Sequence, residues 1–377
     1  MLTRKEIEKR EAEFLATYAV PSKNSKGRAY HEKEHPYRTA FQRDKDRIIF
    51  SAAFRRLQYK TQVFSNFEGD YYRTRLTHTL EVSQISRSVA RTLRVNEDLS
   101  EAIALAHDVG HGPFGHIGEK ILNECMKAHG GFEHNRQSLR IVEVLEDIYS
   151  HGKGLNLTWE TKEGLQKHTY SDTDASVPVN YSTLESQIVD VADEIAYNSH
   201  DLDDGLRAGL FTENDLHDLR LIRGILDKIK AEHLNINRYQ YVHLLIRYLI
   251  NEQVTDLLKE SDRRINDSNI ETREDVKAAK VRIIDFSEGM KKKKKEIKEF
   301  LYENFYLNPH VIKIVDLAKE CLNGLFEIYI KDPSKMPTHF CKKSQVQGED
   351  PYRIICDYVS GMTDRFAYDE YKRQTKE

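Results

Sequence analysis

A ten-residue stretch from His107 to His116, HDVGHGPFGH, places three histidines and one aspartate directly after an apolar run. Neutral imidazoles and ionised carboxylates together bind hard-to-borderline divalent cations. Adjacent His107 and Asp108 cannot aim at one ion from the middle of a helix, because neighbouring side chains diverge by ~100° at 3.6 residues per turn. The glycines that follow relax this constraint at a helix end. The fold must therefore bring further ligands to this turn from other helices.

Two further ligands are predicted on either side of this stretch. His78 ends a polar turn before an apolar helix, and Asp193 interrupts an otherwise apolar helical face. Two histidines and two aspartates leave positions open on a six-coordinate ion, which is typical of a catalytic site. A closed tetrahedral zinc site is the structural alternative, but a carboxylate-rich set without thiolates favours Mn²⁺, Fe²⁺ or Mg²⁺. Asp193 has its own alternatives, a helix cap or a surface acid, and Asp190 competes with it one turn earlier.

Composition favours an all-α protein, since the chain has 32% charged residues but only 8 Pro and 18 Gly. The net charge of −3 gives no global field toward nucleic acid or anionic membranes, so any anion site must be local. Scattered cysteines and a charged N-terminus predict reduced thiols and a cytoplasmic location. No apolar run approaches the ~18 to 20 residues of a membrane span, so no membrane association is expected.

Apolar spacing predicts core helices over residues 43–63, 76–93, 97–107 and 184–210, and long charged helices in the C-terminal third, including 238–258. We therefore expect three regions: an N-terminal arm over 1–40 that begins with a helix to about residue 18, a core over 41–215 that carries the metal and catalytic residues, and a helical C-terminal region over 216–377 packed on the core.

Two segments have less regular patterns. Residues 150–182 are rich in Gly, Ser and Thr, which predicts a short helix between loops that are mobile or face a ligand. Five lysines, Lys291 to Lys295, precede an amphipathic pattern that ends near Tyr306. A solvated helix face is the preferred interpretation of this run, and a patch for nucleotides or single-stranded DNA is the alternative.

Six segments resemble the HD-domain phosphohydrolases, and within them the deoxyguanosine triphosphate triphosphohydrolase group, particularly its type 2 dGTPase-like branch. They are PYRTAFQRDKDRIIFSAAFRRLQYKTQVF, THTLEV, AHDVGHGPFGHIGE, GLNLTWETKEG, DEIAYNSHDLDDG and GMTDRFAYDEY, spread from about residue 25 to residue 373. The resemblance implies an HD-domain helical phosphohydrolase core with additional C-terminal helices.

The same resemblance implies roles for the metal and proton-transfer residues. The metal ligands would be His78, His107, Asp108 and Asp193. His116 would be the principal catalytic histidine near the α-phosphate, with Glu119 and His134 as a relay that sets its protonation. A histidine between two hydrogen-bonding partners is a common arrangement for proton transfer near neutral pH.

The resemblance also implies substrate contacts. Arg75 and His111 would face the phosphates, Gln62 and Asp201 would bond the sugar 3′-hydroxyl, and the Tyr197 ring would pack where a 2′-hydroxyl would clash. Each has a plainer alternative: Arg75 pairs with an acid on the next helix, Gln62 is an exposed helical side chain, and Tyr197 is a core aromatic. The spacing shared with Asp193 favours the functional interpretation of Tyr197.

The activity that the resemblance implies is metal-dependent conversion of a deoxynucleoside triphosphate to deoxynucleoside and inorganic triphosphate. The alternatives are an HD phosphohydrolase on other nucleotides and a nucleotide- or nucleic-acid-binding sensor with a vestigial site. Homo-oligomers, often hexamers, and regulation by a second dNTP or single-stranded DNA are implied partners. One position departs from the vertebrate relative: Glu194 replaces a lysine that contacts the triphosphate, so lysines or arginines of the C-terminal half are expected to supply that charge.

Overall fold

The computed structural model describes residues 1–62, 73–150, 152–166, 183–344 and 350–375, and these ranges form an all-α fold, as predicted. Its helices are α1 (Arg4–Phe14), α2 (Ala40–Ile49), α3 (Ala52–Arg56), α4 (Arg75–Thr92), α5 (Glu97–Ala106), α6 (Gly115–Cys125), α7 (His134–Arg140), α8 (Trp159–Leu165), α9 (Leu184–Arg207), α10 (Arg220–Glu232), α11 (Arg238–Asp267), α12 (Arg273–Ala278), α13 (Glu288–Leu301), α14 (Pro309–Lys331), α15 (Thr338–Ser344), α16 (Pro351–Ser360) and α17 (Asp364–Thr375). No described helix is both long and apolar enough to cross a membrane.

The chain forms two compact units, each assembled from three separate stretches. The first unit comprises residues 1–47, 80–105 and 157–308, and the second comprises residues 48–79, 106–156 and 309–377. The units interleave along the sequence, so compactness alone does not reproduce the three-region division at residues 40 and 215. That division stays a prediction.

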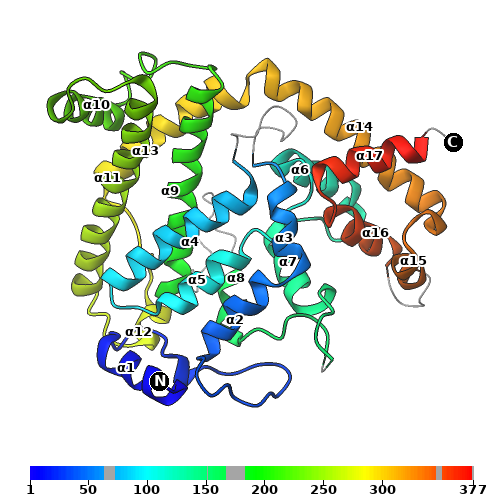
Figure 1. Ribbon diagram of the computed structural model, residues 1–377, viewed down its shortest axis with the longest axis horizontal. Coiled ribbons are helices and arrows are strands. Elements are labelled where there is room, and N and C mark those ends of the chain that lie inside the picture. Colours follow the sequence, from blue (N-terminus) through cyan, green and yellow to red (C-terminus); the bar gives the residue numbers. More distant parts are fainter. Residues whose placement is uncertain (63–72, 151, 167–182, 345–349, 376–377) are drawn as a thin grey trace. The chain divides into compact units, whose positions relative to one another are not determined.

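Helix α9 is the central helix of the first unit, where it packs against α8, α11 and α13 (Figure 1). The Thr183 side chain caps it by accepting a hydrogen bond from the Ser186 backbone N–H. Its predicted apolar positions, Ile188, Val191, Ala192, Ile195 and Ala196, are all buried. The periodicity therefore identified both the helix and its core face, and polar residues of α9 are held in position by this apolar packing.

The second unit is built around α14, which packs against α6, α16 and α17 (Figure 1). Its core contains Leu122 and Met126 from the α6 region, Leu322 and Phe326 from α14, and Val359 from α16. Burial of such side chains stabilises a fold by roughly 1.5–3 kcal/mol each. The C-terminal helices thus form one core with the helix that follows the histidine-rich turn.

The predicted helix over 43–63 is wrong as a single element, while α4, α5 and α9 are confirmed. The chain breaks at Ser51, whose hydroxyl donates to the Ile48 carbonyl and accepts from the Phe54 backbone N–H at 3.1 Å. Serine competes for backbone hydrogen bonds in this way and starts a new helix, α3. Val63 of the predicted helix lies outside the described residues.

The two irregular segments also differ from expectation in part. Lysines 291–295 lie inside α13 instead of before it, and Lys294 is only 3% exposed, so the run is not simply a solvated face. The predicted short helix in 150–182 is confirmed as α8, and Thr158 before it donates from both its backbone N–H and its hydroxyl to Asp44. Residues 151 and 167–182 lie outside the described ranges.

Candidate active site

Three of the predicted metal ligands meet within the second unit. His78 lies on the first turn of α4, and His107 and Asp108 directly follow the end of α5. All three are buried, and one ligand atom of each lies within 4.8 Å of the others. Two imidazoles and a carboxylate at this separation suit a divalent transition-metal ion or Mg²⁺. The adjacent pair can converge because it stands at the end of a helix, as the sequence predicts.

Glycine at position 110 allows α7 to approach this turn. A Cβ on Gly110 would lie 2.2 Å from the Ser138 backbone nitrogen and 2.3 Å from the His134 carbonyl oxygen. Ser138 then ties the two segments together, since its hydroxyl donates to the His107 carbonyl and accepts from the Gly110 backbone N–H, both at 2.9 Å. The absence of a side chain at Gly110 thus allows His134 to lie beside the histidine-rich turn, residues 107–116.

A second backbone feature places Gln62 and Arg75. Phe114 and Gly115 both adopt the left-handed conformation, with φ of 62° and 57°. A Cβ on Gly115 would approach the Gln62 carbonyl oxygen to 3.1 Å and Arg75 Nη2 to 3.3 Å. The buried Asp364 carboxylate fixes this turn by accepting from the backbone N–H groups of Thr61 and Phe114, both at 2.9 Å. Gln62 is buried, so its interpretation as an exposed helical side chain is wrong.

Arg75 pairs with the candidate metal ligand Asp108. Its Nη1 donates to Asp108 Oδ2 at 2.8 Å, and the side chain is only 1% exposed. Within the described part of the chain, its Nε and Nη2 have no hydrogen-bond partner. Buried guanidinium donors are normally satisfied, so these two atoms can serve a ligand with oxygen acceptors. The predicted pairing with an acid and the predicted phosphate contact are therefore compatible.

Histidines 111, 116 and 134 form a connected group with Glu119. His111 Nε2 lies 3.4 Å from Asp108 Oδ1, and its ring stacks on His134 with centroids 3.9 Å apart. His134 Nδ1 lies 2.9 Å from Glu119 Oε1, and His116 Nδ1 lies 3.6 Å from Glu119 Oε2. The structure therefore brings together the three predicted relay residues and connects them to the candidate metal ligand Asp108 through His111.

Electrostatic interactions and burial set the charge states of Glu119 and His111. Burial alone would raise the pKa of Glu119, but hydrogen bonds with His116 and His134 outweigh it and hold the pKa well below its usual range. Burial lowers the pKa of His111 well below the ordinary value, and the nearby Arg75 cation adds to this. Glu119 is thus a carboxylate at neutral pH and His111 a neutral imidazole.

The other predicted residues lie on α9, in the first unit. Asp193 is half-buried, and its membership of the metal donor set stays a prediction. Asp190, the competing carboxylate, lies 3.4 Å from Arg282 Nη2. Tyr197 and Asp201 share one face, because the Tyr306 hydroxyl donates to Asp201 and lies 2.6 Å from the Tyr197 hydroxyl.

Tyr306 is the residue of this cluster that the sequence did not identify. It ends a π-helical turn, Tyr302–Tyr306, and its ring stacks parallel to Tyr197 at an interplanar angle of 13°. Burial, with the Asp201 carboxylate, raises the pKa of Tyr306 far above its usual value, so its hydroxyl remains a donor. The sequence signal is weak, because Tyr306 stands at the predicted end of a helix, 109 positions from Tyr197.

Glu194, the departure from the vertebrate relative, binds two lysines of α13. Lys294 Nζ lies 3.2 Å and Lys298 Nζ lies 2.6 Å from its carboxylate. Lys294 also lies 3.5 Å from the centroid of the Phe286 ring. The C-terminal half therefore places two cations beside Glu194, the residue that follows Asp193, and their contact with a triphosphate stays a prediction.

Lys60 is a buried lysine that contacts the histidine-rich turn. Its amine donates to the carbonyl of His111 and, at 2.9 Å, to that of Ser360. Burial, with the Arg56 charge, lowers its pKa to about 7. Lys60→Met is expected to destabilise the protein by about 1–3 kcal/mol for each carbonyl left unbonded. The measurement is urea unfolding of both proteins.

The pH dependence of this difference follows from the lowered pKa of Lys60. The unfolded chain keeps the proton up to the ordinary lysine pKa, whereas the folded protein releases it from about pH 7. The wild type should therefore gain stability relative to Lys60→Met as pH rises from 7 to 9. The exposed Lys120→Met on α6 is the matched control, with an expected change within about 0.5 kcal/mol at each pH. A pH-independent difference between wild type and Lys60→Met would contradict the lowered pKa.

Two family models match segments of the chain that contain these residues. The HD domain model matches residues 75–198, and the phosphohydrolase-associated domain model matches residues 284–373. The first match begins at Arg75 and includes His78, the turn 107–116 and Asp193. The second includes α13, Tyr306 and the C-terminal helices.

Three curated relatives are named deoxyguanosinetriphosphate triphosphohydrolase-like protein. The relative from Nitrosomonas europaea is 45% identical over 95% of this chain and 97% of its own length. The Geobacter sulfurreducens relative is 45% identical over 95% and 94%, and the Rickettsia bellii relative is 43% identical over 96% and 98%. Similarity of this degree over nearly the whole length places the chain in the HD-domain family of deoxyguanosinetriphosphate triphosphohydrolase-like proteins, which are phosphohydrolases.

Proposed function

We propose that this phosphohydrolase is a metal-dependent deoxynucleoside triphosphate triphosphohydrolase, which uses water to convert a dNTP to a deoxynucleoside and inorganic triphosphate. One observation carries the proposal. Within the second unit, a candidate metal-binding triad continues through His111 into the His134, Glu119 and His116 group. Such a connected set of ligands and proton-transfer groups is what hydrolysis of a phosphate ester needs.

His78, His107, Asp108 and Asp193 would hold the divalent ion, with Mn²⁺, Mg²⁺ or Fe²⁺ as the candidates. When bound, the ion supplies Lewis-acid polarisation of a phosphate oxygen and offsets charge that develops there. The donor chemistry fits this ion class, since the described triad offers two imidazoles and a carboxylate without a thiolate. Arg75 fixes the orientation of the Asp108 carboxylate through its Nη1 donor.

His116 is the proposed proton-transfer residue. A deoxynucleoside leaves as a 5′-alkoxide, which is a strong base and therefore needs a proton as the bond to the α-phosphorus breaks. Nδ1 of His116 is directed at Glu119, so Nε2 is the ring atom that can exchange a proton with substrate. The Glu119 carboxylate stabilises the protonated imidazole and His134 orients that carboxylate.

Phosphate binding and sugar binding use different residues. Arg75, through Nε and Nη2, and His111 are the proposed phosphate contacts, and Lys294 and Lys298 are the proposed source of the further positive charge. The sugar contacts proposed from the sequence are Gln62, Tyr197 and Asp201. Tyr306 joins them, because its hydrogen bonds hold Tyr197 and Asp201 in one arrangement. A ribose 2′-hydroxyl would be rejected by the rigid tyrosine pair.

The direct test is product analysis after incubation with each dNTP and Mn²⁺. We expect deoxynucleoside and inorganic triphosphate, with ¹⁸O from labelled water in the triphosphate, because water attacks the α-phosphorus. The corresponding ribonucleotides serve as the sugar control and should react far more slowly. Release of nucleoside monophosphate and pyrophosphate would contradict the proposed bond cleavage. Turnover only of monophosphates or cyclic dinucleotides would favour the alternative HD phosphohydrolase.

A sensor with a vestigial site is the alternative from another class. The intact His116, Glu119 and His134 group argues against it, since binding alone does not require a proton relay. Absence of turnover with every nucleotide and metal, combined with saturable nucleotide binding, would favour the sensor.

A further inference from the structure

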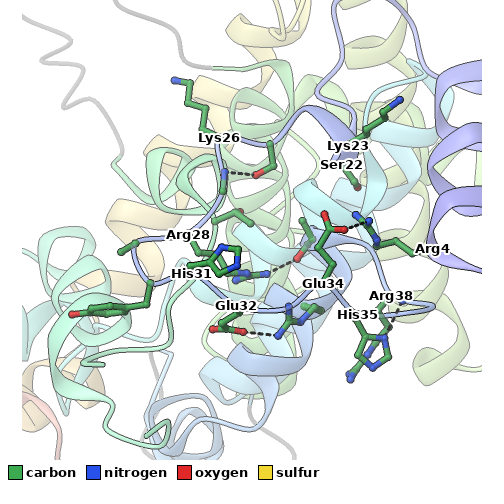
Figure 2. A pocket seen from close by; sticks show the side chains of 17 residues that line it. Arg4, Ser22, Lys23, Lys26, Arg28, His31, Glu32, Glu34, His35 and Arg38 are labelled. Atoms are coloured by element: carbon green, nitrogen blue, oxygen red, sulfur yellow. Dashed lines mark hydrogen bonds and ion pairs between the residues drawn. The ribbon is translucent and has the colours of Figure 1, made fainter. Parts of the chain in front are cut away.

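A basic cavity lies within the first unit, apart from every residue assigned to the candidate active site. Its volume is about 430 Å³, and it is formed by Arg4, by the arm between Ser22 and Arg43, and by Thr158 before α8 (Figure 2). Cavities of ~300–1,000 Å³ are of the size that holds small-molecule ligands. The segment around Thr158 belongs to the GLNLTWETKEG motif, to which the proposed function gives no role.

The side chains that line this cavity carry more positive than negative charge. Six lining residues are cations and two are carboxylates, Glu32 and Glu34; the cations are Arg4, Lys23, Lys26, Arg28, Arg38 and Arg43. Each carboxylate already has a cationic partner. Glu34 pairs with Arg4 (Figure 2), and Glu32 pairs with Arg43 at 2.5 Å and also with Arg47. Arg4 pairs as well with Glu8, an acid outside the lining, at 2.8 Å, so each of these three arginines is paired with a carboxylate.

Acids outside the lining pair with two of the remaining cations. Asp44 lies 2.5 Å from Arg28, and Asp46 pairs with Arg38. Arg43 lies close to other cations. Burial lowers the pKa of its guanidinium, and the neighbouring Arg28 and Arg47 charges lower it further. A ligand with negative charge would relieve this repulsion between like charges.

Lys23 and Lys26 are the two lining cations that remain. In the ranges that the structure describes, no carboxylate lies within 4.0 Å of either ammonium group. The Lys26 ammonium instead lies 5.2 Å from the centroid of the Trp159 ring. The Lys26 backbone N–H donates a hydrogen bond to the Glu160 carboxylate at 2.8 Å. Both lysines are exposed, so their ammonium groups can reorient toward a ligand at little cost.

We propose that this cavity binds a multiply charged phosphate anion, either an inorganic polyphosphate or the phosphate chain of a nucleotide. Lysine provides point charges for phosphate oxygens, and arginine provides planar pairs of donors. The arginines are held in place by their carboxylates, so little side-chain freedom is lost when an anion enters. Binding at this cavity does not depend on catalysis, so the proposal can be tested independently of the proposed hydrolysis.

Trp159 provides a local probe, because it is the only tryptophan of the chain and contacts Lys26. Inorganic triphosphate titrated into the metal-loaded enzyme at constant ionic strength should change the tryptophan emission saturably. Lys23→Gln/Lys26→Gln should weaken this binding at least tenfold. Lys33→Gln, an exposed lysine of the same arm that does not line the cavity, is the matched control and should bind like the wild type.

Isothermal titration calorimetry gives a second readout, in which the double variant should lose one binding event and keep any event at the active site. ATP in place of inorganic triphosphate distinguishes the two sources: tighter binding of ATP identifies a nucleotide, and equal or weaker binding identifies the polyphosphate alone. The proposal is overturned if neither method detects a site that the double variant weakens, or if chloride at equal ionic strength produces the same emission change.

Discussion

Replacing Asp108 with asparagine is expected to abolish turnover and divalent-metal binding together. The carboxylate is one of the three described donors of the candidate metal site and the partner of the buried Arg75 guanidinium. Loss of Lewis-acid stabilisation worth ~4 kcal/mol or more corresponds to at least ~10³-fold in kcat. The measurements are steady-state kinetics with Mn²⁺ and metal content by mass spectrometry. Asparagine is chosen over alanine because it keeps an oxygen acceptor for the otherwise unpaired Arg75 cation.

The matched control is Asp147→Asn, an exposed aspartate of the same unit, which should retain wild-type kinetics and metal content. A thermal melt of each variant separates loss of metal from loss of fold. An Asp108→Asn enzyme that turns over dNTPs normally without bound metal would remove the basis for the proposed metal centre.

Periodicity predicted the helices well where one face of a helix is continuously apolar. Helix α9 is the clearest case, since the spacing from Ile188 to Ala196 located both the helix and its buried side. The pattern failed at Ser51, because the hydroxyl of a serine can end one helix and cap the next without changing the apolar spacing. The prediction of a solvated face failed at Lys294 for a related reason. Charge predicts exposure, but the carboxylate of Glu194 on another helix offsets the cost of burying the Lys294 ammonium group.

The sequence predicted which residue types make up the candidate site, but it did not predict the contacts between them. The histidine-rich turn and His78 were evident from residue types, and the structure brings them together. Nothing in the spacing indicated that His111 stacks on His134, because that contact depends on the close approach of α7 at Gly110. Tyr306 shows the limit most plainly, since a hydrogen bond between residues 109 positions apart leaves no local pattern.

His116→Ala is expected to lower kcat by ~10²–10⁴-fold while metal content stays at the wild-type level. The imidazole is half-exposed, its Nδ1 faces Glu119, and it is not one of the three donors His78, His107 and Asp108, so its removal should leave the metal site and the fold intact. This combination distinguishes His116 from the proposed ligand Asp108, because loss of Asp108 is expected to remove both turnover and bound metal. A sensor without catalysis would show no turnover to lose, and an enzyme that tolerates His116→Ala would require another proton donor.

Glu119→Gln tests the relay behind His116. Because the pKa of Glu119 lies well below its usual range, the wild-type carboxylate is ionised throughout pH 5–9, and the variant loses that charge at every pH in this interval. We expect kcat to fall ~10²-fold across the whole interval. Glu124→Gln, an exposed glutamate of the same helix, is the matched control. An effect confined to the acidic end of the profile would show that the Glu119 carboxylate titrates there and is not held ionised by its two histidines.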